Sequence, residues 1–528
     1  MYSAKSLYQA AVTVVNKILP KNVNLKKSLI VCLVLVAVGA CMSFYGVPKI
    51  VKTIVKFLCV LKPGRFVRNK HEMKLPFTYK LYLWNVTNPD EIMAGTAKPK
   101  MQEIGPYVFS QSKQNIETLD DETADTYEFD LWNIYHFNPE LSAPLTGNEQ
   151  ITFVHIVIVA AAVKVKLESP HLQDTLMEAL DIIFQNPSSI FMTMKAIDFI
   201  DKGVEINCSQ TAYAATQLCR VLKRHKVLKI VEPSEENVNS PLGTKPLDGN
   251  LLRYRWFDKL NNSIQARYTV MRGVQNIHDV GQITAVRGKP KLNVFKHDDK
   301  CNVINGTDKL FYPPFQKKND VVWVYSDDAC KSFPLRFQYE QSVRGMRTAW
   351  KSLNISDSSL MDPLCECDSY AGCFLPGTID MYYCLDIFVM GSLPHFYSTD
   401  PRIRETLEGM HPNEALHKTG IYFDLLTGSP ILTFERYQVS WLVKRIPEYP
   451  IFSSIAGDVW IPVLWYEESF SIPKADLALL IFSRISKTVG IVTGVILMVV
   501  GVLGIIVLAI RFHYQTSIKP ENGIQSTK

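Results

Sequence analysis

Two long runs of apolar residues lie near the two ends of the chain. Residues 29–47 and 488–510 contain no charged side chain. A helix rises about 1.5 Å per residue, so each run can cross a hydrocarbon layer about 30 Å thick. A helix also satisfies its own backbone groups, which lipid cannot do. The pattern therefore predicts two membrane-spanning helices, with one large domain of residues 48–487 between them.

Sequons and cysteines indicate on which side of the membrane this domain lies. Eight cysteines from Cys208 onward favour an oxidising, extracellular compartment. The first 28 residues carry five lysines and no acid, as expected of a cytoplasmic tail. We expect a plasma-membrane protein whose tails, residues 1–28 and 511–528, are both cytoplasmic. The five glycosylation candidates are Asn85, Asn207, Asn261, Asn305 and Asn354.

The charge of the chain adds little. The first apolar run is too long and starts too late for a cleavable signal peptide, which predicts a signal anchor. Much of the net charge of +6 comes from basic residues beside that run. We therefore infer no nucleic-acid partner.

Between the apolar runs, patches of aromatic and branched residues predict a mostly β domain. Residues 77–86 (FTYKLYLWNV) form the clearest strand, which a turn at Asn-Pro-Asp ends. The continuous apolar run 151–165 is consistent with a buried strand. Further strands are predicted at 321–325, 387–390 and 437–443.

Helical spacing is concentrated in residues 169–226, which predicts a helical subdomain. The first helix starts near residue 169, the second covers about 187–197, and the third covers 209–225. The basic end of the third helix suits the helix dipole as a solvated face. It also has a second interpretation, as a docking surface for an anionic partner. The ligand-capture candidates are Lys195, Lys223, Arg224 and Lys226.

The cysteines between residues 301 and 384 show a distinctive spacing. Zinc is the competing interpretation of clustered cysteines, but no second C-x2-C pair is present, and disulfides are favoured. Eight cysteines allow 105 pairings, so spacing alone cannot choose among them. The six residues in this region are Cys301, Cys330, Cys365, Cys367, Cys373 and Cys384.

Six motifs, in order along nearly the whole chain, resemble signatures of the CD36 family of class B scavenger receptors. A seventh segment, INCSQTAYAATQLC (206–219), is most similar to the insect sensory neuron membrane proteins of that family, and their second subfamily is the predicted assignment. The six motifs are YLWNVTNPDE (82–91), EIGPYVF (103–109), NGTDKLFYPPF (305–315), SLPHFY (392–397), GMHPNEALHKT (409–419) and VWIPVLWYEE (459–468).

The resemblance implies an α+β fold for the large domain: an antiparallel β-barrel-like core, an apical helical bundle at 169–226 and an internal apolar tunnel. It also implies three disulfides, Cys301–Cys365, Cys330–Cys384 and Cys367–Cys373. Cys208 and Cys219 have no counterpart in the vertebrate receptors and are candidates for a fourth. The tails contain no cysteine, which sets this chain apart from the palmitoylated members of the family.

The function implied is that of an olfactory receptor or co-receptor for lipophilic ligands. Pheromones, odorants or fatty-acid-like molecules would pass to the membrane or to an odorant receptor complex, with odorant-binding proteins as further partners. Motifs of hydrolases, zinc proteases and phosphate loops are absent, so we expect no enzyme, cofactor or metal. A scavenger-type lipid or lipoprotein uptake receptor is an alternative. A two-helix ligand-gated channel is disfavoured, since the second apolar run offers only Thr488, Thr493 and glycines.

Overall fold

The protein was studied as a computed structural model. It describes residues 13–14, 24–224, 229–230, 251–254, 261–295, 300–356 and 372–518. The chain divides into two compact units. The terminal-helix unit comprises residues 1–57 and 473–528, and the sheet unit comprises residues 58–472.

Two helices dominate the terminal-helix unit. The first runs over Leu25–Cys59 and consists of α2 (Leu25–Ala40), a π-helical turn (Cys41–Gly46) and α3 (Val47–Cys59). The second is α15 (Lys474–Ile518). Both are long and apolar enough to cross a membrane, and both extend beyond the apolar runs at 29–47 and 488–510. At about 1.5 Å per residue, the first helix is roughly 50 Å long.

Glycines let these two helices approach each other closely. A Cβ on Gly494 would meet the backbone oxygen of Gly39 at 2.9 Å, and one on Gly501 would meet that of Cys32 at 2.7 Å. The Ser43 hydroxyl donates a hydrogen bond to the Ile491 carbonyl at 3.1 Å. Gly46 follows Gly39 and Ser43 at helical spacing, but a Cβ on Gly46 would meet only Cys41 of its own helix. The contact therefore uses small residues in the manner of membrane helix pairs.

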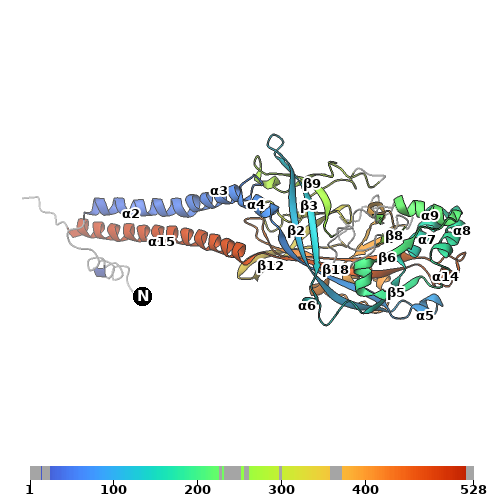
Figure 1. Cartoon of the computed structure of the whole chain (residues 1–528). Coiled ribbons are helices and arrows are strands. Elements are labelled where there is room, and N and C mark those ends of the chain that lie inside the picture. The colour runs from blue at the N-terminus through green and yellow to red at the C-terminus, as the bar shows by residue number, and fades with distance from the viewer. Residues whose placement is uncertain are drawn as a thin grey trace, which may run out of the picture. The chain divides into compact units, whose positions relative to one another are not determined.

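The sheet unit is built on one antiparallel sheet of thirteen described strands (Figure 1). Its strand order is β10-β9-β3-β2-β1-β18-β17-β16-β13-β12-β11, with β14 and β15 attached to β17. The strands are β1 (Leu75–Val86), β2 (Met101–Asp121), β3 (Thr126–Phe137), β9 (Ser263–Met271), β10 (Ile283–Val286), β11 (Val322–Ser326), β12 (Lys331–Val343), β13 (Met346–Leu353), β14 (Thr378–Asp380), β15 (Val389–Ser392), β16 (Gly420–Phe423), β17 (Pro430–Val443) and β18 (Val459–Ser471).

A loop joins the two edges of this sheet. Strands β10 and β11 end the order and, among the described residues, do not pair with each other. The Ile283 amide donates to the Gly306 carbonyl at 2.9 Å, on the β10 side. On the β11 side, the Thr307 amide donates to the Trp323 carbonyl at 3.2 Å, and the Thr307 carbonyl accepts from the Tyr325 amide at 3.1 Å. The closed barrel that the family resemblance implies stays a prediction.

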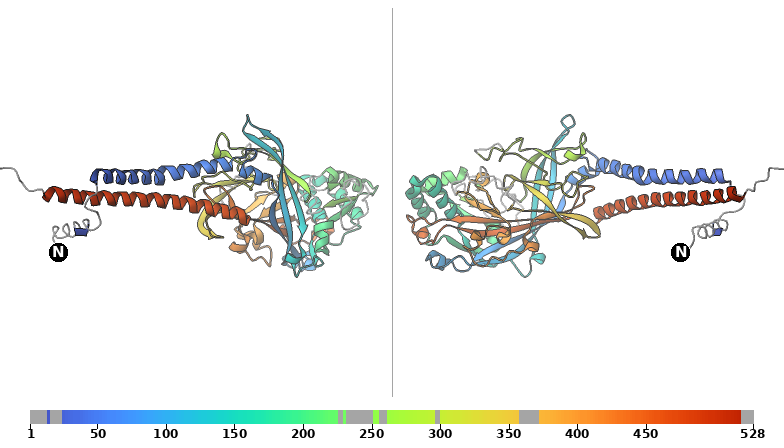
Figure 2. Two further views of the ribbon diagram at one scale, coloured as in Figure 1. Left: turned by 60° about the vertical axis from the view of Figure 1, so that its left-hand side comes forward. Right: turned by 180° about the vertical axis from the view of Figure 1, so that it is seen from behind.

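The three longer helices of the sheet unit lie together at one end of it (Figures 1 and 2). They are α7 (Ile156–Glu168), α8 (Gln173–Ile183) and α9 (Tyr213–Arg224). The shorter helices are α4 (Phe66–Glu72), α5 (Pro89–Met93), α6 (Pro139–Ser142), α11 (Tyr382–Leu385), α12 (Pro401–Arg404), α13 (Glu414–His417) and α14 (Pro450–Ser453), with short 3-10 or π turns at Pro170–Leu172, Asp198–Lys202, Ile277–Asp279 and Pro394–Phe396.

Two local predictions in this region are wrong. The apolar run 151–165, predicted as a strand, forms only β4 (Gln150–Val154) before helix α7 begins. The His155 side chain caps α7 by accepting from the Ile158 amide, and an all-apolar run gives no period by which to tell strand from helix. The helix predicted at 187–197 is instead strand β5 (Phe191–Lys195), because this segment pairs with β4.

The remaining strands form a small sheet beside α9. It consists of β6 (Val204–Asn207), β8 (Leu251–Tyr254) and β7 (Lys229–Ile230). The predicted strands at 77–86, 321–325 and 437–443 lie within or overlap β1, β11 and β17, and 387–390 overlaps β15. The helices predicted from residue 169 and at 209–225 correspond to α8 and α9.

Several of the sequence motifs meet in one polar cluster. The Trp465 indole donates to Glu103 Oε2 at 2.7 Å. His395 Nδ1 accepts from the His411 amide, so its Nε2 carries the proton that it donates to Glu103 at 2.6 Å. The His417 ring stacks on His395 at 4.3 Å, and Tyr82 stacks on Trp465. These motifs therefore fasten β1, β2 and β18 to the loops around 395 and 417.

We expect Gly494→Leu to separate the two terminal helices, because no side chain fits against Gly39 and Ser43. Engineered cysteines on the glycine faces should cross-link in the natural chain and lose most of that cross-linking in the variant. Gly46→Leu is the matched control, since Gly46 meets only its own helix, and it should leave cross-linking intact. Equal cross-linking in both variants would contradict the contact.

The buried His417 should make the protein sensitive to acid. Burial, aided by His395, lowers the pKa of His417 to about 4. The unfolded chain therefore binds this proton first, near pH 6.5, and the free energy of unfolding falls as the pH drops towards 4. At about pH 5 this amounts to about 2 kcal/mol. His417→Gln should reduce the loss between neutral pH and pH 5, as measured by chemical unfolding of the full chain in detergent.

The matched control for this experiment is His171→Gln, which alters an exposed histidine. This control should keep the acid sensitivity of the natural chain. If His417→Gln and the natural chain lose stability in parallel as the pH falls, His417 is not the acid-sensitive group.

Candidate ligand-binding cavities

Three cavities lie in the sheet unit and share lining residues. The central cavity has a volume of about 240 Å³. The Phe77 cavity, about 80 Å³, shares seven lining residues with it, and the helix cavity, about 90 Å³, shares three. The residues shared with the Phe77 cavity are Lys113, Lys309, Asp328, Glu435, Tyr437, Tyr466 and Glu468, and those shared with the helix cavity are Tyr254, Ile387 and Trp441.

One strand runs past all three cavities. Alternate residues of a strand point to the same face, and in β17 the five alternate residues from 433 to 441 line cavities. Thr433 lies at the Phe77 cavity and Trp441 at both the central and helix cavities. Eight residues of strand span about 26 Å. The remaining lining residues of this face are Glu435, Tyr437 and Val439.

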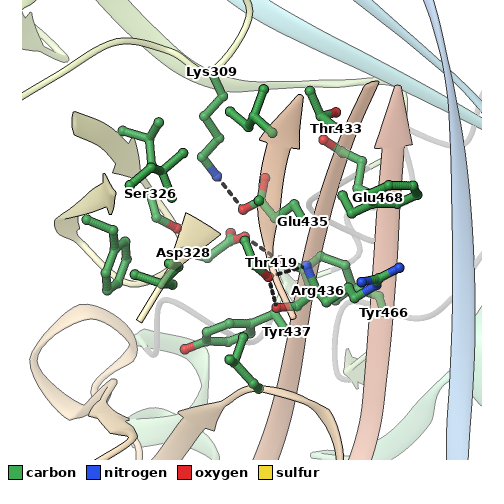
Figure 3. Close-up of a pocket in the computed structure, with 18 of the residues that line it drawn as sticks. Lys309, Ser326, Asp328, Thr419, Thr433, Glu435, Arg436, Tyr437, Tyr466 and Glu468 are labelled. Carbon is green, nitrogen blue, oxygen red and sulfur yellow. Dashed lines mark hydrogen bonds and ion pairs between the residues drawn. The ribbon is translucent and has the colours of Figure 1, made fainter. Parts of the chain in front are cut away.

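The strand register places two carboxylates opposite each other where the Phe77 and central cavities meet. Glu435 of β17 pairs directly with Glu468 of β18. Like charges at such positions repel, and each here forms an ion pair with a lysine. Lys309 binds Glu435 (Figure 3), and Lys113 of β2 binds Glu468. Although burial alone would lower the pKa of Lys309, Glu435 raises it.

Asp328 lies beside Glu435 and Glu468 but, unlike them, forms no ion pair with a described lysine or arginine. Among the described residues, its one hydrogen-bond partner is the Tyr466 hydroxyl, which donates at 3.3 Å. Asp328 is an exposed residue by its accessible surface, because its side chain lines the cavities, although protein atoms surround it on many sides. Burial raises the pKa of Asp328 to about 6, against the opposing effect of Lys309. Figure 3 shows Asp328, Glu435 and Glu468 around the same space.

The helix cavity is almost entirely apolar. Residues 156, 157, 160, 161, 164 and 165 form one face of α7 and line it, opposite Leu218, Val221 and Leu222 of α9. Lys164, its single described charged residue, pairs with Glu168 at 2.9 Å and with Asp386 at 2.6 Å. Such a wall suits a hydrocarbon chain.

The cysteines hold loops around these cavities. A disulfide joins Cys330 to Cys384, which fastens the turn that carries Asp328 to α11. A second disulfide joins Cys208 to Cys219 of α9. Cys301 and Cys373 are also disulfide-bonded. Cys365 and Cys367, their expected partners, lie outside the described residues, so these two pairings stay predictions. Cys59 is a buried free thiol, whose pKa burial raises to about 12, with a contribution from Asp424.

The glycosylation candidates occupy two kinds of surroundings. Asn207, Asn261, Asn305 and Asn354 are exposed, whereas Asn85 is half-buried in β1. The Asn85 side chain accepts from the Thr152 amide at 2.8 Å and donates to Gln102 at 3.2 Å. The geometry thus favours the first four as glycan acceptors, and glycosylation of all five stays a prediction.

The basic residues proposed to capture ligands are only partly described. Lys195 is exposed at the end of β5. Lys223 and Arg224 end α9, but their side chains, like the whole of Lys226, lie outside the described residues. Their role stays a prediction. The pattern at 437–443 predicted the strand but did not identify Asp328, Glu435 or Glu468 as cavity residues. A carboxylate on the same face as Tyr437 and Trp441 was the available signal for Glu435.

Comparison with known proteins identifies the class to which the fold and cavities belong. The model of the CD36 family matches residues 30–512, nearly the whole chain. The protein belongs to the CD36 family.

Among its relatives are insect proteins named Sensory neuron membrane protein 1. That of Manduca sexta is 33% identical over 456 residues, 84% of this chain and 83% of the relative. That of Bombyx mori is 33% identical over 506 residues, 92% of this chain and 93% of the relative. That of Anopheles gambiae is 31% identical over 464 residues, 86% of this chain and 81% of the relative. The similarity to the insect sensory branch is confirmed, and the assignment to its second subfamily stays a prediction.

We expect the Cys330→Ala/Cys384→Ala double variant to lose about 2–5 kcal/mol of stability, because the bridge closes a long loop. Non-reducing peptide mapping should find this bridge in the natural chain, and surface delivery of the variant should fall. Cys41→Ala, which removes an exposed free cysteine, is the control. It should change neither the stability nor the surface delivery. Free thiols at positions 330 and 384 in the mature protein would contradict the pairing.

Proposed function

We propose that this protein is a cell-surface receptor or co-receptor that binds lipophilic molecules and passes them towards the membrane or a neighbouring odorant receptor. The single observation that carries the proposal is the row of three cavities along the inner face of β17, each sharing walls with the next. Pheromones, odorants and fatty-acid-like molecules are poorly soluble in water. Burying each CH2 group of such a ligand gains about 0.8 kcal/mol.

The three cavities would form parts of one passage through a barrel-like core that the helices around α7 and α9 cover at one end. The helix cavity would admit the ligand, and the Phe77 cavity would release it. Val221 of α9 is 54% exposed while it lines the helix cavity, which supports an opening there. The basic end of α9 would attract carriers such as odorant-binding proteins.

The arrangement in the membrane follows from the same proposal. Segments 29–47 and 488–510 would span the plasma membrane, both tails would be cytoplasmic and residues 48–487 would face the outside. The names of the relatives, sensory neuron membrane proteins, support expression in sensory neurons. The place beside an odorant receptor complex belongs to the proposal. Membership of the CD36 family supports a receptor role without catalysis.

A bulky residue inside the row of cavities should block the passage. Val439 lines the central cavity from the middle of β17. Val439→Trp should abolish photolabelling of the β17 peptide by an uncharged long-chain alkyl diazirine, with the full chain held in lipid nanodiscs. It should also slow the response of odorant-receptor cells to a long-chain ligand.

Val439→Ala is the matched control, because it enlarges the cavity at the same position and should preserve both labelling and response. Surface delivery and glycosylation should be equal in the two variants. If the natural chain is not labelled in β17, the binding role is wrong. If labelling occurs but the onset, offset and sensitivity of the cell response do not depend on the protein, a scavenging role accounts for the binding instead.

A further inference from the structure

The Phe77 and central cavities carry an excess of negative charge. Their described lining contains five carboxylates and three cations. The carboxylates are Asp308, Asp327, Asp328, Glu435 and Glu468, and the cations are Lys113, Lys309 and Arg436.

Each of these cations already has a carboxylate partner. Lys309 pairs with Glu435, and Lys113 pairs with Glu468. Arg436 pairs with Glu467 at 2.7 Å and donates to two backbone carbonyls. An incoming anion would therefore have to break an existing ion pair to gain a cation, within a region of low dielectric where that cost is large.

The carboxylates differ in how far they are neutralised. Asp327 pairs with Arg287 at 2.6 Å, and Asp308 lies 3.0 Å from His71. Asp328 has no such partner among the described residues and accepts only from the Tyr466 hydroxyl. It lines both cavities, at the place where the Phe77 and central cavities meet. A ligand whose chain fills the row must bring some group past it.

On the basis of the lipid-binding role proposed above, we propose that Asp328 makes the cavities prefer lipophilic molecules with an uncharged, hydrogen-bond-donating head group over the ionised forms of fatty-acid-like molecules. A long-chain alcohol is the simplest such ligand. Its hydroxyl can donate to the Asp328 carboxylate and accept from a tyrosine hydroxyl, while its chain occupies the apolar walls. A carboxylate or sulfonate head would lie against a negative charge that no ion pair with a described residue neutralises.

Competition against the photolabel tests this selectivity. The full chain in phosphatidylcholine nanodiscs is labelled with the alkyl diazirine, and labelling of the β17 peptide is read with hexadecanol or hexadecyl sulfonate as competitor. The sulfonate stays ionised at every pH used. At about pH 7.5, hexadecanol should compete at a concentration about tenfold lower than the sulfonate, because one unpaired charge at close range has at least that effect.

Three variants make the result specific. Asp328→Ala should bring the two competitors to within about twofold of each other. Asp328→Glu should restore the preference, since it keeps the charge. Asp90→Ala, which removes an exposed carboxylate from α5, should leave the preference unchanged. In each variant, labelling without competitor reports whether the cavities still bind hydrocarbon.

A change of pH supplies a second readout. Asp328 faces Lys309, Asp327, Glu435 and Glu468, and burial raises its pKa to about 6. At about pH 5 most of the Asp328 side chains are neutral, so the preference for hexadecanol should narrow in the natural chain. It should not change with pH in Asp328→Ala.

The outcomes separate the two proposals. Absence of β17 labelling in the natural chain overturns the binding role itself. Strong labelling with equal competition by hexadecanol and the sulfonate overturns the selectivity and leaves the binding role intact. Stronger competition by the sulfonate would mean that Lys309 or Lys113 exchanges its partner for the ligand, which also overturns the selectivity.

Discussion

Two like charges face each other inside the sheet, and the interior is organised around them. Glu435 and Glu468 are directly opposite in the β17–β18 register, an arrangement that only nearby cations make stable. Lys309 comes from the loop after the sheet edge and Lys113 from β2, so the two ion pairs tie distant segments to the central strands. The Phe77 and central cavities lie beside these two ion pairs.

The sequence predicted the parts of the fold whose pattern has a clear period or length. The terminal helices followed from two runs too long and too apolar for other structure, and strand β1 from its alternating aromatic residues. The run at 151–165 was ambiguous because its nearly continuous apolar residues show neither a strand nor a helix period. The His155 cap and the pairing of β4 with β5 decide where the strand ends and the helix begins. Tertiary pairing likewise made 191–195 a strand.

The site was harder to predict than the fold. The family motifs identify residues that converge, yet Glu103, His395 and Trp465 fasten loops to the sheet and do not line the cavities. Lys309, Tyr466 and Glu468 also lie in those motifs, but nothing local distinguishes them from structural residues. Asp328 follows β11 as an ordinary turn residue. Its place at the cavities depends on the tertiary fold, in which the Cys330–Cys384 bridge fastens that turn, and no linear pattern shows this.

The loop that joins β10 to β11 gives this sheet an unusual mechanical property. Elsewhere, neighbouring strands are held by continuous ladders, such as the long register between β17 and β18, which cannot widen without breaking many bonds together. At the loop, a few backbone bonds through Gly306 and Thr307 carry the connection. Local opening begins where such bonds are fewest. Opening of the sheet unit is therefore expected to begin at this loop, while the wall formed by β17 and β18 keeps its shape.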